Sequence, residues 1–165
     1  YKRQDYARSL LVERLALAAE LADSYRVRLA FEPLHPMVCG FRSIVSTLEE
    51  SLDILDQMDD SHDIGLAIDT YALWWEHDLQ EKLKRAGRRI LNYHVSDWLA
   101  DTRDLRLDRG MPGDGQIALC DWRHMIEAAG YFGPIEVEIF SRDRWWKAPA
   151  ETMIEQIIQR MNSAF

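Results

Sequence analysis

The chain has 165 residues, 47 % of them hydrophobic, which is enough apolar material for one buried core. Its net charge of −8 argues against a nucleic-acid partner, because such proteins usually carry a basic face. No run approaches the roughly 18 to 20 apolar residues of a membrane span, and no secretory signal opens the chain.

Predicted helices and strands alternate along the chain. Apolar residues at three- and four-residue spacing predict helices, and apolar residues at every second position predict strands. The expected helices cover residues 3–26, 47–58, 78–87, 121–129 and 149–161. The expected strands cover residues 27–32, 64–69, 90–95 and 135–140, with a shorter one over 116–119. Repeated strand–helix order predicts βαβ units and a parallel sheet.

Several helix ends carry recognisable signals. Ser46 or Thr47 is expected to cap the second helix, and Asp78 the third. Gly87 and Gly130 follow the last periodic residues of two helices, where a residue without a side chain is favoured. These signals place the helix boundaries to within a few residues.

The four clear strands share an unusual pattern of side chains. Each has one bulky apolar face that we expect to pack against helices: Val27/Leu29/Phe31, Ile64/Leu66/Ile68, Leu91/Tyr93/Val95 and Ile135/Val137/Ile139. The opposite faces end at the carboxyl side in Glu32, Asp69, His94 and Glu138, with Ala30, Ala67, Asn92 and Glu136 one step deeper. Doubly wound sheets are apolar on both faces, whereas a barrel has a crowded interior and its active site at the strands' carboxyl ends. The pattern therefore favours a barrel.

Three carboxylates and an imidazole form a suitable set of ligands for one divalent metal ion such as Mn²⁺, Mg²⁺, Co²⁺ or Zn²⁺. Taken singly, a strand-end acid is more often a helix cap, and a lone histidine is more often a packed or surface residue. Glu32, Asp69, His94 and Glu138 occupy the same register on four strands. Without a cation the three acids would repel one another, so the set as a whole favours a metal site.

Five segments in this order resemble the xylose-isomerase-like TIM barrels: 31–36, 67–71, 93–97, 108–115 and 133–140. That superfamily includes sugar and sugar-phosphate isomerases and epimerases, and is related to endonuclease IV and the family 2 AP endonucleases. The resemblance implies an α/β fold, the TIM (β/α)8 barrel, with residues 1–165 forming a single partial barrel domain that covers about strands 4 to 8.

A full barrel needs about 250 residues, so the resemblance implies that the first three βα units are absent from this chain. The first residue is Tyr1 and not Met, so the chain is either processed or part of something longer. Five strands alone would leave two open sheet edges that invite pairing or aggregation, and we expect the intact protein to close the barrel.

The resemblance also implies a mechanism. In the epimerase branch, the metal holds two oxygens of a ketose and stabilises a cis-enediolate. Carried over, Glu32 and Glu138 would be the catalytic acid/base pair as well as metal ligands, one removing a proton α to the carbonyl and the other returning one. Asp69 and His94 would be metal ligands only.

Further residues are candidates for supporting roles. Asp97 is expected to orient His94 or its loop. Arg109 resembles the family's substrate-contacting arginine, the alternative being a surface arginine that bridges loop carboxylates. His35 and Trp74 lie in loops after strands and are candidates for substrate binding, although prolines beside His35 could simply order it.

Two positions stand apart from this set. Many family members carry a histidine three residues after the metal-binding aspartate, where this chain has Ala72. Glu136 points inward below Glu138 and needs a buried partner such as Arg28 or Asn92, or a raised pKa.

The leading functional prediction is a metal-dependent isomerase or epimerase of a small sugar or sugar-derived ketone. Alternatives are an inosose-type dehydratase on the same metal site and a non-catalytic barrel that binds a sugar or a partner. An abasic-site endonuclease would need more histidine ligands and a basic groove. We expect a small-molecule partner, no nucleic acid and no membrane, while homo-oligomer formation stays open. Cys39 and Cys120 lack CxxC spacing, which fits a reducing cytoplasm.

Overall fold

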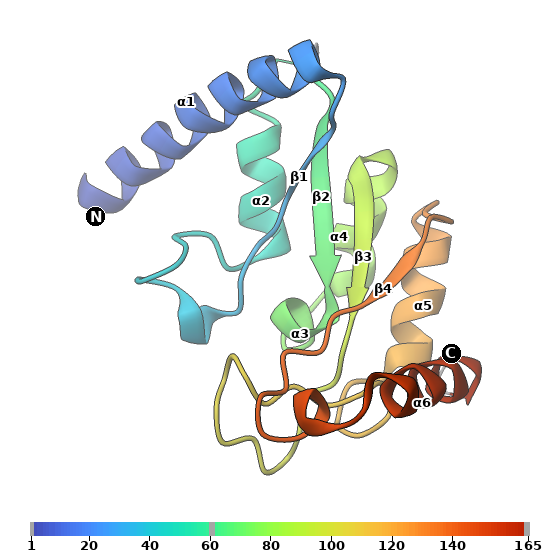
Figure 1. Ribbon diagram of the computed structural model, residues 1–165. Helices are drawn as coiled ribbons and strands as arrows, with labels where there is room; N and C mark the ends of the chain where they lie inside the picture. Colours follow the sequence, from blue (N-terminus) through green and yellow to red (C-terminus); the bar gives the residue numbers. More distant parts are fainter. Residues whose placement is uncertain (1, 60–61, 164–165) are drawn as a thin grey trace.

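The computed structural model describes residues 2–59 and 62–163 (Figure 1). Its sheet contains the parallel strands β1 (Leu29–Phe31), β2 (Ile64–Asp69), β3 (Ile90–Val95) and β4 (Ile135–Val137), adjacent in that order. The helices are α1 (Lys2–Tyr25), α2 (Leu48–Leu55), α3 (Thr70–Leu73), α4 (Leu79–Ala86), α5 (Leu119–Ala128) and α6 (Ala150–Ser163). Short 3-10 turns are η1 (Pro36–Val38), η2 (Gly87–Arg89) and η3 (Trp145–Lys147). Parallel strands in chain order with helical crossovers make a partial barrel, as predicted.

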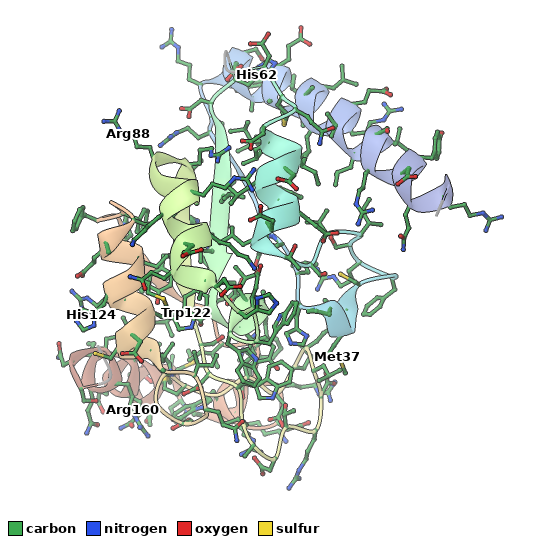
Figure 2. The ribbon with its side chains drawn as sticks, turned by 180° about the vertical axis from the view of Figure 1, so that it is seen from behind. Met37, His62, Arg88, Trp122, His124 and Arg160 are labelled. Carbon is green, nitrogen blue, oxygen red and sulfur yellow. The ribbon has the colours of Figure 1, made fainter. Side chains whose placement is uncertain are left out.

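The core lies between the sheet and the helices α2, α4 and α5, which pack side by side in that order (Figure 1). Leu66 and Ile68 of β2 and Tyr93 and Val95 of β3 are fully buried there. Trp122 projects from α5 into this layer, while His124 of the same helix points to solvent (Figure 2). Phe31, Ile135 and Val137 of the outer strands pack against this core as predicted. The expectation for Val27 is wrong, because it precedes β1 and is 55 % exposed. The other face of the sheet is left to form the barrel interior.

Helix ends follow the predicted signals with one exception. Thr47 caps α2, its hydroxyl accepting a hydrogen bond from the Glu50 amide at 3.1 Å. Gly130 has a φ of 95°, which lets the chain leave α5 in a left-handed conformation. Asp78 stands at the N-cap position of α4 as predicted, but its side chain makes no cap hydrogen bond and pairs instead with His77 Nδ1 at 2.8 Å.

A β-bulge interrupts the pairing of β2 and β3 and corrects the predicted side-chain parity. Leu66 pairs with Ile90, but the next residue of β2 pairs with Asn92, so Leu91 is the extra residue. Ile90 joins the core at 4 % exposure, whereas Leu91 lies over Gly65 on the opposite face. The predicted faces are inverted at these two positions and hold from Asn92 onward.

The expected strand over residues 116–119 is wrong, and α5 already begins at Leu119. The Gln116 amide donates to the Trp98 carbonyl at 3.1 Å, and the Ile117 amide donates to the Asp97 carboxylate at 3.0 Å. These amides are bound to the loop after β3 and are not available to the sheet. The described part of the chain therefore contributes four strands, and not five, to the barrel.

The two outer strands are shorter than predicted. The expected range 27–32 contracts to β1, and the expected range 135–140 contracts to β4. Within the described ranges, neither strand has a strand partner on its outer edge. Helix α1 extends beyond the sheet from the β1 side and touches α2 (Figure 1). Positions beside an unpaired edge lose the ladder hydrogen bonds that would extend the strand.

Candidate metal centre

Four predicted ligands lie at the carboxyl edge of the sheet, one from each strand. Asp69 is the last residue of β2 and pairs in register with His94 of β3. Glu32 follows β1 directly, and Glu138 follows β4, its amide donating to the Val95 carbonyl at 3.0 Å. The parallel sheet therefore brings residues more than a hundred positions apart to one rim.

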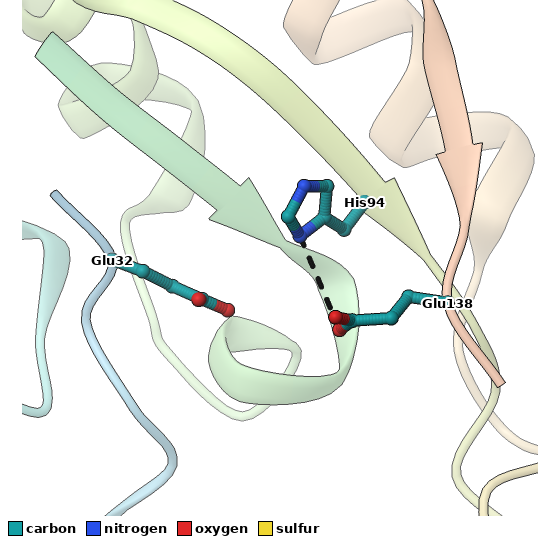
Figure 3. Close-up of side chains that lie close together, drawn as sticks. All are labelled: Glu32, His94 and Glu138. Carbon is teal, nitrogen blue, oxygen red and sulfur yellow. Dashed lines mark ion pairs between the residues drawn. The ribbon is translucent and has the colours of Figure 1, made fainter. Parts of the chain in front are cut away.

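Three of these side chains converge most closely. Ligand atoms of Glu32, His94 and Glu138 all lie within 4.8 Å of one another (Figure 3). His94 Nδ1 lies 4.0 Å from Glu138 Oε2 and is buried without a hydrogen-bond partner. Two carboxylates and a buried ring nitrogen with an unused lone pair fit the donor set of a divalent metal ion.

Asp69 is linked to this group through Arg109. Its side chain is buried, with Oδ1 accepting a hydrogen bond from the Tyr71 amide at 2.9 Å. Its Oδ2 pairs with Arg109 Nη1 at 2.9 Å, and the same nitrogen lies 3.1 Å from Glu138 Oε2. One guanidinium nitrogen thus partly neutralises two of the four predicted ligands.

Arg109 is held from several sides. Its guanidinium lies over the Tyr71 ring at 4.3 Å and over the Phe140 ring at 5.0 Å. Its amide donates to the Phe140 carbonyl at 2.9 Å, which joins the loop after β3 to the loop after β4. The guanidinium faces the rim carboxylates, so the alternative of a surface arginine does not describe its position.

Glu32 has a strongly altered acidity. Burial, together with the nearby carboxylates Asp69 and Glu138, raises the pKa of Glu32 to about 7, while Arg109 and Arg42 oppose the rise. A carboxyl group with a pKa near neutrality is suited to taking up and returning a proton.

The second nitrogen of His94 faces Glu136, a contact that sequence reasoning did not assign. His94 Nε2 lies 3.5 Å from Glu136 Oε2, and the Asn92 amide lies 3.3 Å from the same ring nitrogen. Asn92 Nδ2 also donates to Glu136 Oε1 at 3.4 Å, whereas Arg28 pairs with Asp63. The expectation that Glu136 needs a buried partner is wrong for the described residues, because its side chain is 57 % exposed on a strand without an outer neighbour. A proton on Nε2 directed at Glu136 leaves Nδ1 free for a metal. Strand parity contained the signal, because Asn92, His94 and Glu136 share one face.

Asp97 organises a loop and does not contact His94 through any described interaction. Its fully buried carboxylate accepts hydrogen bonds from four backbone amides at 2.8–3.0 Å: Trp98, Gly113, Gly115 and Ile117. Gly115 is required because a Cβ there would lie 2.2 Å from the Trp98 carbonyl oxygen and 2.5 Å from Asp97 Oδ1. Asp97 was expected to orient either His94 or its own loop, and its hydrogen bonds are to the amides of the loop.

A cavity of about 250 Å³ adjoins the rim and includes Asp69 and Arg109 in its lining. His35 and Ala72 also line it. His35 stacks on the Trp98 ring with centroids 4.8 Å apart, and its Nδ1 accepts a hydrogen bond from the Met37 amide at 3.2 Å. Trp74 is not part of this lining and packs against the core and Trp98 instead.

The chain belongs to the xylose isomerase-like TIM barrel family, whose model matches residues 2–164. No curated protein matches it. Among the described residues, no helix is both long and apolar enough to cross a membrane.

Solved structures show the same fold. The chain is similar to protein SMc04130 of Sinorhizobium meliloti 1021, with 44 % identity over 99 % of this chain and 60 % of that one, and a TM-score of 0.93. It is similar to the IolI protein with a bound zinc atom (24 % identity, 98 % of this chain, 57 % of that one, TM-score 0.81). It is also similar to the D-psicose 3-epimerase of Clostridium cellulolyticum H10, with 19 % identity over 93 % of this chain and 53 % of that one, and a TM-score of 0.73. The chain spans 53–60 % of the length of these structures.

Proposed function

We propose that this chain carries the metal centre of a divalent-metal-dependent isomerase or epimerase that acts on a small sugar or sugar-derived ketone. The observation that carries the proposal is the convergence of Glu32, His94 and Glu138 within 4.8 Å at the carboxyl edge of the sheet. Membership of the family and the zinc atom in the IolI structure support it. Residues 1–165 would form one partial barrel domain of the protein.

Glu32, Asp69, His94 and Glu138 would hold the metal ion, which would be Mn²⁺, Mg²⁺, Co²⁺ or Zn²⁺. A bound divalent ion would supply a Lewis acid that polarises a carbonyl oxygen and stabilises negative charge on it. Glu136 would hold the His94 ring so that Nδ1 faces the other ligands, because it lies beside Nε2.

Glu32 and Glu138 would exchange the proton α to the substrate carbonyl. They come from opposite ends of the sheet, after β1 and β4, and their carboxyl groups face one another across the rim (Figure 3). Glu32, with its pKa raised to about 7, can hold a proton near neutral pH and release it. The Glu138 carboxylate is paired with Arg109 at 3.1 Å, which would fix its position as the second proton-transfer group.

Arg109 and His35 would contact the substrate, since both line the cavity beside the rim. Trp74 would act at a distance, by packing against the Trp98 ring on which His35 stacks. Ala72 lines the cavity where many family members have a histidine, so the substrate would find space there in place of an imidazole. Both cysteines are free, which is consistent with the cytoplasm as the place of action.

The test is exchange of carbon-bound hydrogen with D₂O, in a panel of ketoses and inososes with added Mn²⁺. We expect exchange with the wild type and a loss of at least about a hundredfold in Glu32→Gln and in Glu138→Gln, the scale of general acid–base catalysis. Glu151→Gln on α6 is the matched control, because Glu151 is exposed and distant in sequence from the rim.

The products of the reaction distinguish the isomerase or epimerase from the dehydratase and from the non-catalytic barrel. An epimer or isomer of the substrate supports the proposal, whereas loss of water from an inosose identifies the dehydratase. Wild-type exchange rates in both Gln variants would show that these carboxylates do not transfer the proton. Sugar binding without any exchange would identify the non-catalytic barrel.

A further inference from the structure

The cavity beside the rim carries more positive charge than the reaction described above requires. Its lining includes the three arginines Arg42, Arg106 and Arg109. Asp69 is the one carboxylate among its lining residues, and it is already paired with Arg109. At about 250 Å³, the cavity lies just below the range of about 300–1,000 Å³ usual for ligand sites, so it suits a small molecule.

Two of these arginines have no carboxylate partner among the described residues. Arg42 comes from the loop between η1 and α2, and Arg106 from the loop between β3 and α5. Within residues 2–59 and 62–163, neither side chain has an ion pair or a side-chain hydrogen bond, and both are exposed at the mouth of the cavity. Neighbouring Arg142 and Arg144, in contrast, are both paired with aspartates.

The absence of partners is notable in a chain with an excess of acids. The sequence has 28 acidic and 20 basic residues, so carboxylates are plentiful for any arginine that needs one. Two cations directed at one cavity repel each other, and a guanidinium binds planar carboxylate or phosphate oxygens through paired hydrogen bonds.

The charge of Arg42 also reaches the rim. Arg42 lines a second, larger hollow together with Glu32 itself. An anion held by Arg42 would therefore lie close to the proposed proton-transfer group.

We infer that the substrate carries an anionic group, a phosphate or a carboxylate, bound by Arg42 and Arg106 at the mouth of the cavity. Its carbonyl end would face Asp69, Arg109 and the rim. The inference rests on the proposed function for the identity of the reacting end, but the anion site itself stands on the two free arginines. It places the preferred substrate among sugar phosphates or sugar acids, ahead of neutral sugars.

Three hydroxyketones with the same reacting end test this directly. Dihydroxyacetone is neutral, dihydroxyacetone phosphate carries a phosphate and hydroxypyruvate carries a carboxylate. Their dissociation constants would be measured by titration calorimetry on the protein, with and without Mn²⁺. We expect one of the two anions to bind at least about tenfold more tightly than the neutral compound, because charge-assisted hydrogen bonds contribute that much or more. Which anion binds more tightly distinguishes phosphate from carboxylate.

The variants Arg42→Gln and Arg106→Gln should each remove most of this preference while leaving the affinity for dihydroxyacetone unchanged. Arg103→Gln is the matched control: Arg103 lies in the same loop as Arg106, is exposed, and lines a different hollow. It removes the same charge, so its anion preference should stay at the wild-type value.

The inference is overturned if neither anion binds more tightly than dihydroxyacetone. It is also overturned if a variant that combines Arg42→Gln with Arg106→Gln still prefers an anion over dihydroxyacetone. The same holds if Arg103→Gln loses as much of that preference as Arg42→Gln and Arg106→Gln do. Failure of the proposed function looks different: anion binding would depend on Arg42 and Arg106, yet no variant or wild type would exchange hydrogen with D₂O.

Discussion

At the scale of single residues, Glu32 and Glu138 differ in what surrounds them. Burial and nearby carboxylates raise the pKa of Glu32, whereas Glu138 is paired with Arg109 at 3.1 Å. The raised pKa suits Glu32 to taking up and returning a proton near neutral pH, and the contact with Arg109 fixes where the Glu138 carboxylate lies.

The raised pKa of Glu32 predicts a pH dependence of stability in the metal-free protein. The folded state holds the proton more tightly than the unfolded chain, in which the pKa is near 4.5. The stabilising contribution is therefore complete below that pH and is lost as the pH rises through about 7. We expect the loss to amount to roughly 2–3 kcal/mol.

Urea unfolding in EDTA between about pH 5 and pH 8 measures this effect. Glu32→Gln cannot titrate, so its free energy of unfolding should fall less steeply over the same range than that of the wild type. Identical pH profiles for the two proteins would contradict the assignment of the raised pKa to Glu32.

Glu136 predicts a change in metal affinity without direct metal contact. Replacing it with Gln keeps its size but removes the carboxylate beside His94 Nε2. We expect the dissociation constant for Zn²⁺ or Mn²⁺ to rise by about 10- to 100-fold, as for other carboxylates that orient a ligating histidine.

Titration calorimetry of Glu136→Gln and of Glu127→Gln separates a local from a general effect of charge. Glu127 lies on α5 and pairs with Arg123, away from the rim. Equal metal affinities in the two variants would show that Glu136 does not position His94.

At the scale of elements, the loop between β3 and α5 is built around Asp97. Its buried carboxylate binds four amides, and its backbone pairs with Gly110 through two hydrogen bonds of 2.9 and 3.0 Å. Arg109 directly precedes Gly110, so this loop sets where the guanidinium meets Asp69 and Glu138. Asp97 and its backbone pairing with Gly110 thus form a scaffold that positions Arg109.

Removing the Asp97 side chain should therefore destabilise the protein and displace Arg109. Asp97→Ala leaves four amides without their acceptor, and we expect a loss of about 3 kcal/mol or more in the free energy of unfolding. Asp101→Ala, in the same loop but exposed, should cost much less, because an exposed ion pair contributes little to stability. Urea denaturation compares them, and similar losses would contradict the scaffold role.

Strand prediction was accurate where side chains alternate strictly between unlike faces. The bounds 64–69 and 90–95 match β2 and β3, both of which have neighbours on each side. Parity also predicted that Glu32, Asp69, His94 and Glu138 share one rim. The alternation of faces assigned Leu91 to the wrong face of the sheet, because a bulge depends on how two strands pair and not on either sequence alone.

Other features depend on contacts between distant segments and were not predictable from local patterns. The segment 116–119 has strand-like residues, but its amides bind Asp97 and Trp98. The pairing of Arg109 with Asp69 and Glu138 joins three separate loops and strand ends. The family resemblance indicated Arg109 as a substrate contact. It gave no indication that Arg109 also partly neutralises Asp69 and Glu138, two of the proposed metal ligands.

At the scale of the whole molecule, all four proposed metal ligands come from one partial barrel. The chain spans 53–60 % of the length of related solved structures, and the four strands of its sheet carry all four of these residues, from Glu32 to Glu138. The overall charge is −8 while the cavity beside the rim is lined by three arginines. The cavity is therefore locally positive on a protein that is negative overall, which would favour entry of an anion at the cavity.

Metal content tests the central claim most directly. The protein would be stripped with EDTA, reconstituted with Mn²⁺ or Zn²⁺, desalted and analysed by mass spectrometry of the elements. We predict about one ion per chain in the wild type and in His124→Ala, whose histidine is exposed on α5. His94→Ala, folded as judged by circular dichroism, should retain less than about a tenth of that. A wild type without bound metal, or His94→Ala with a full equivalent, would contradict the metal centre.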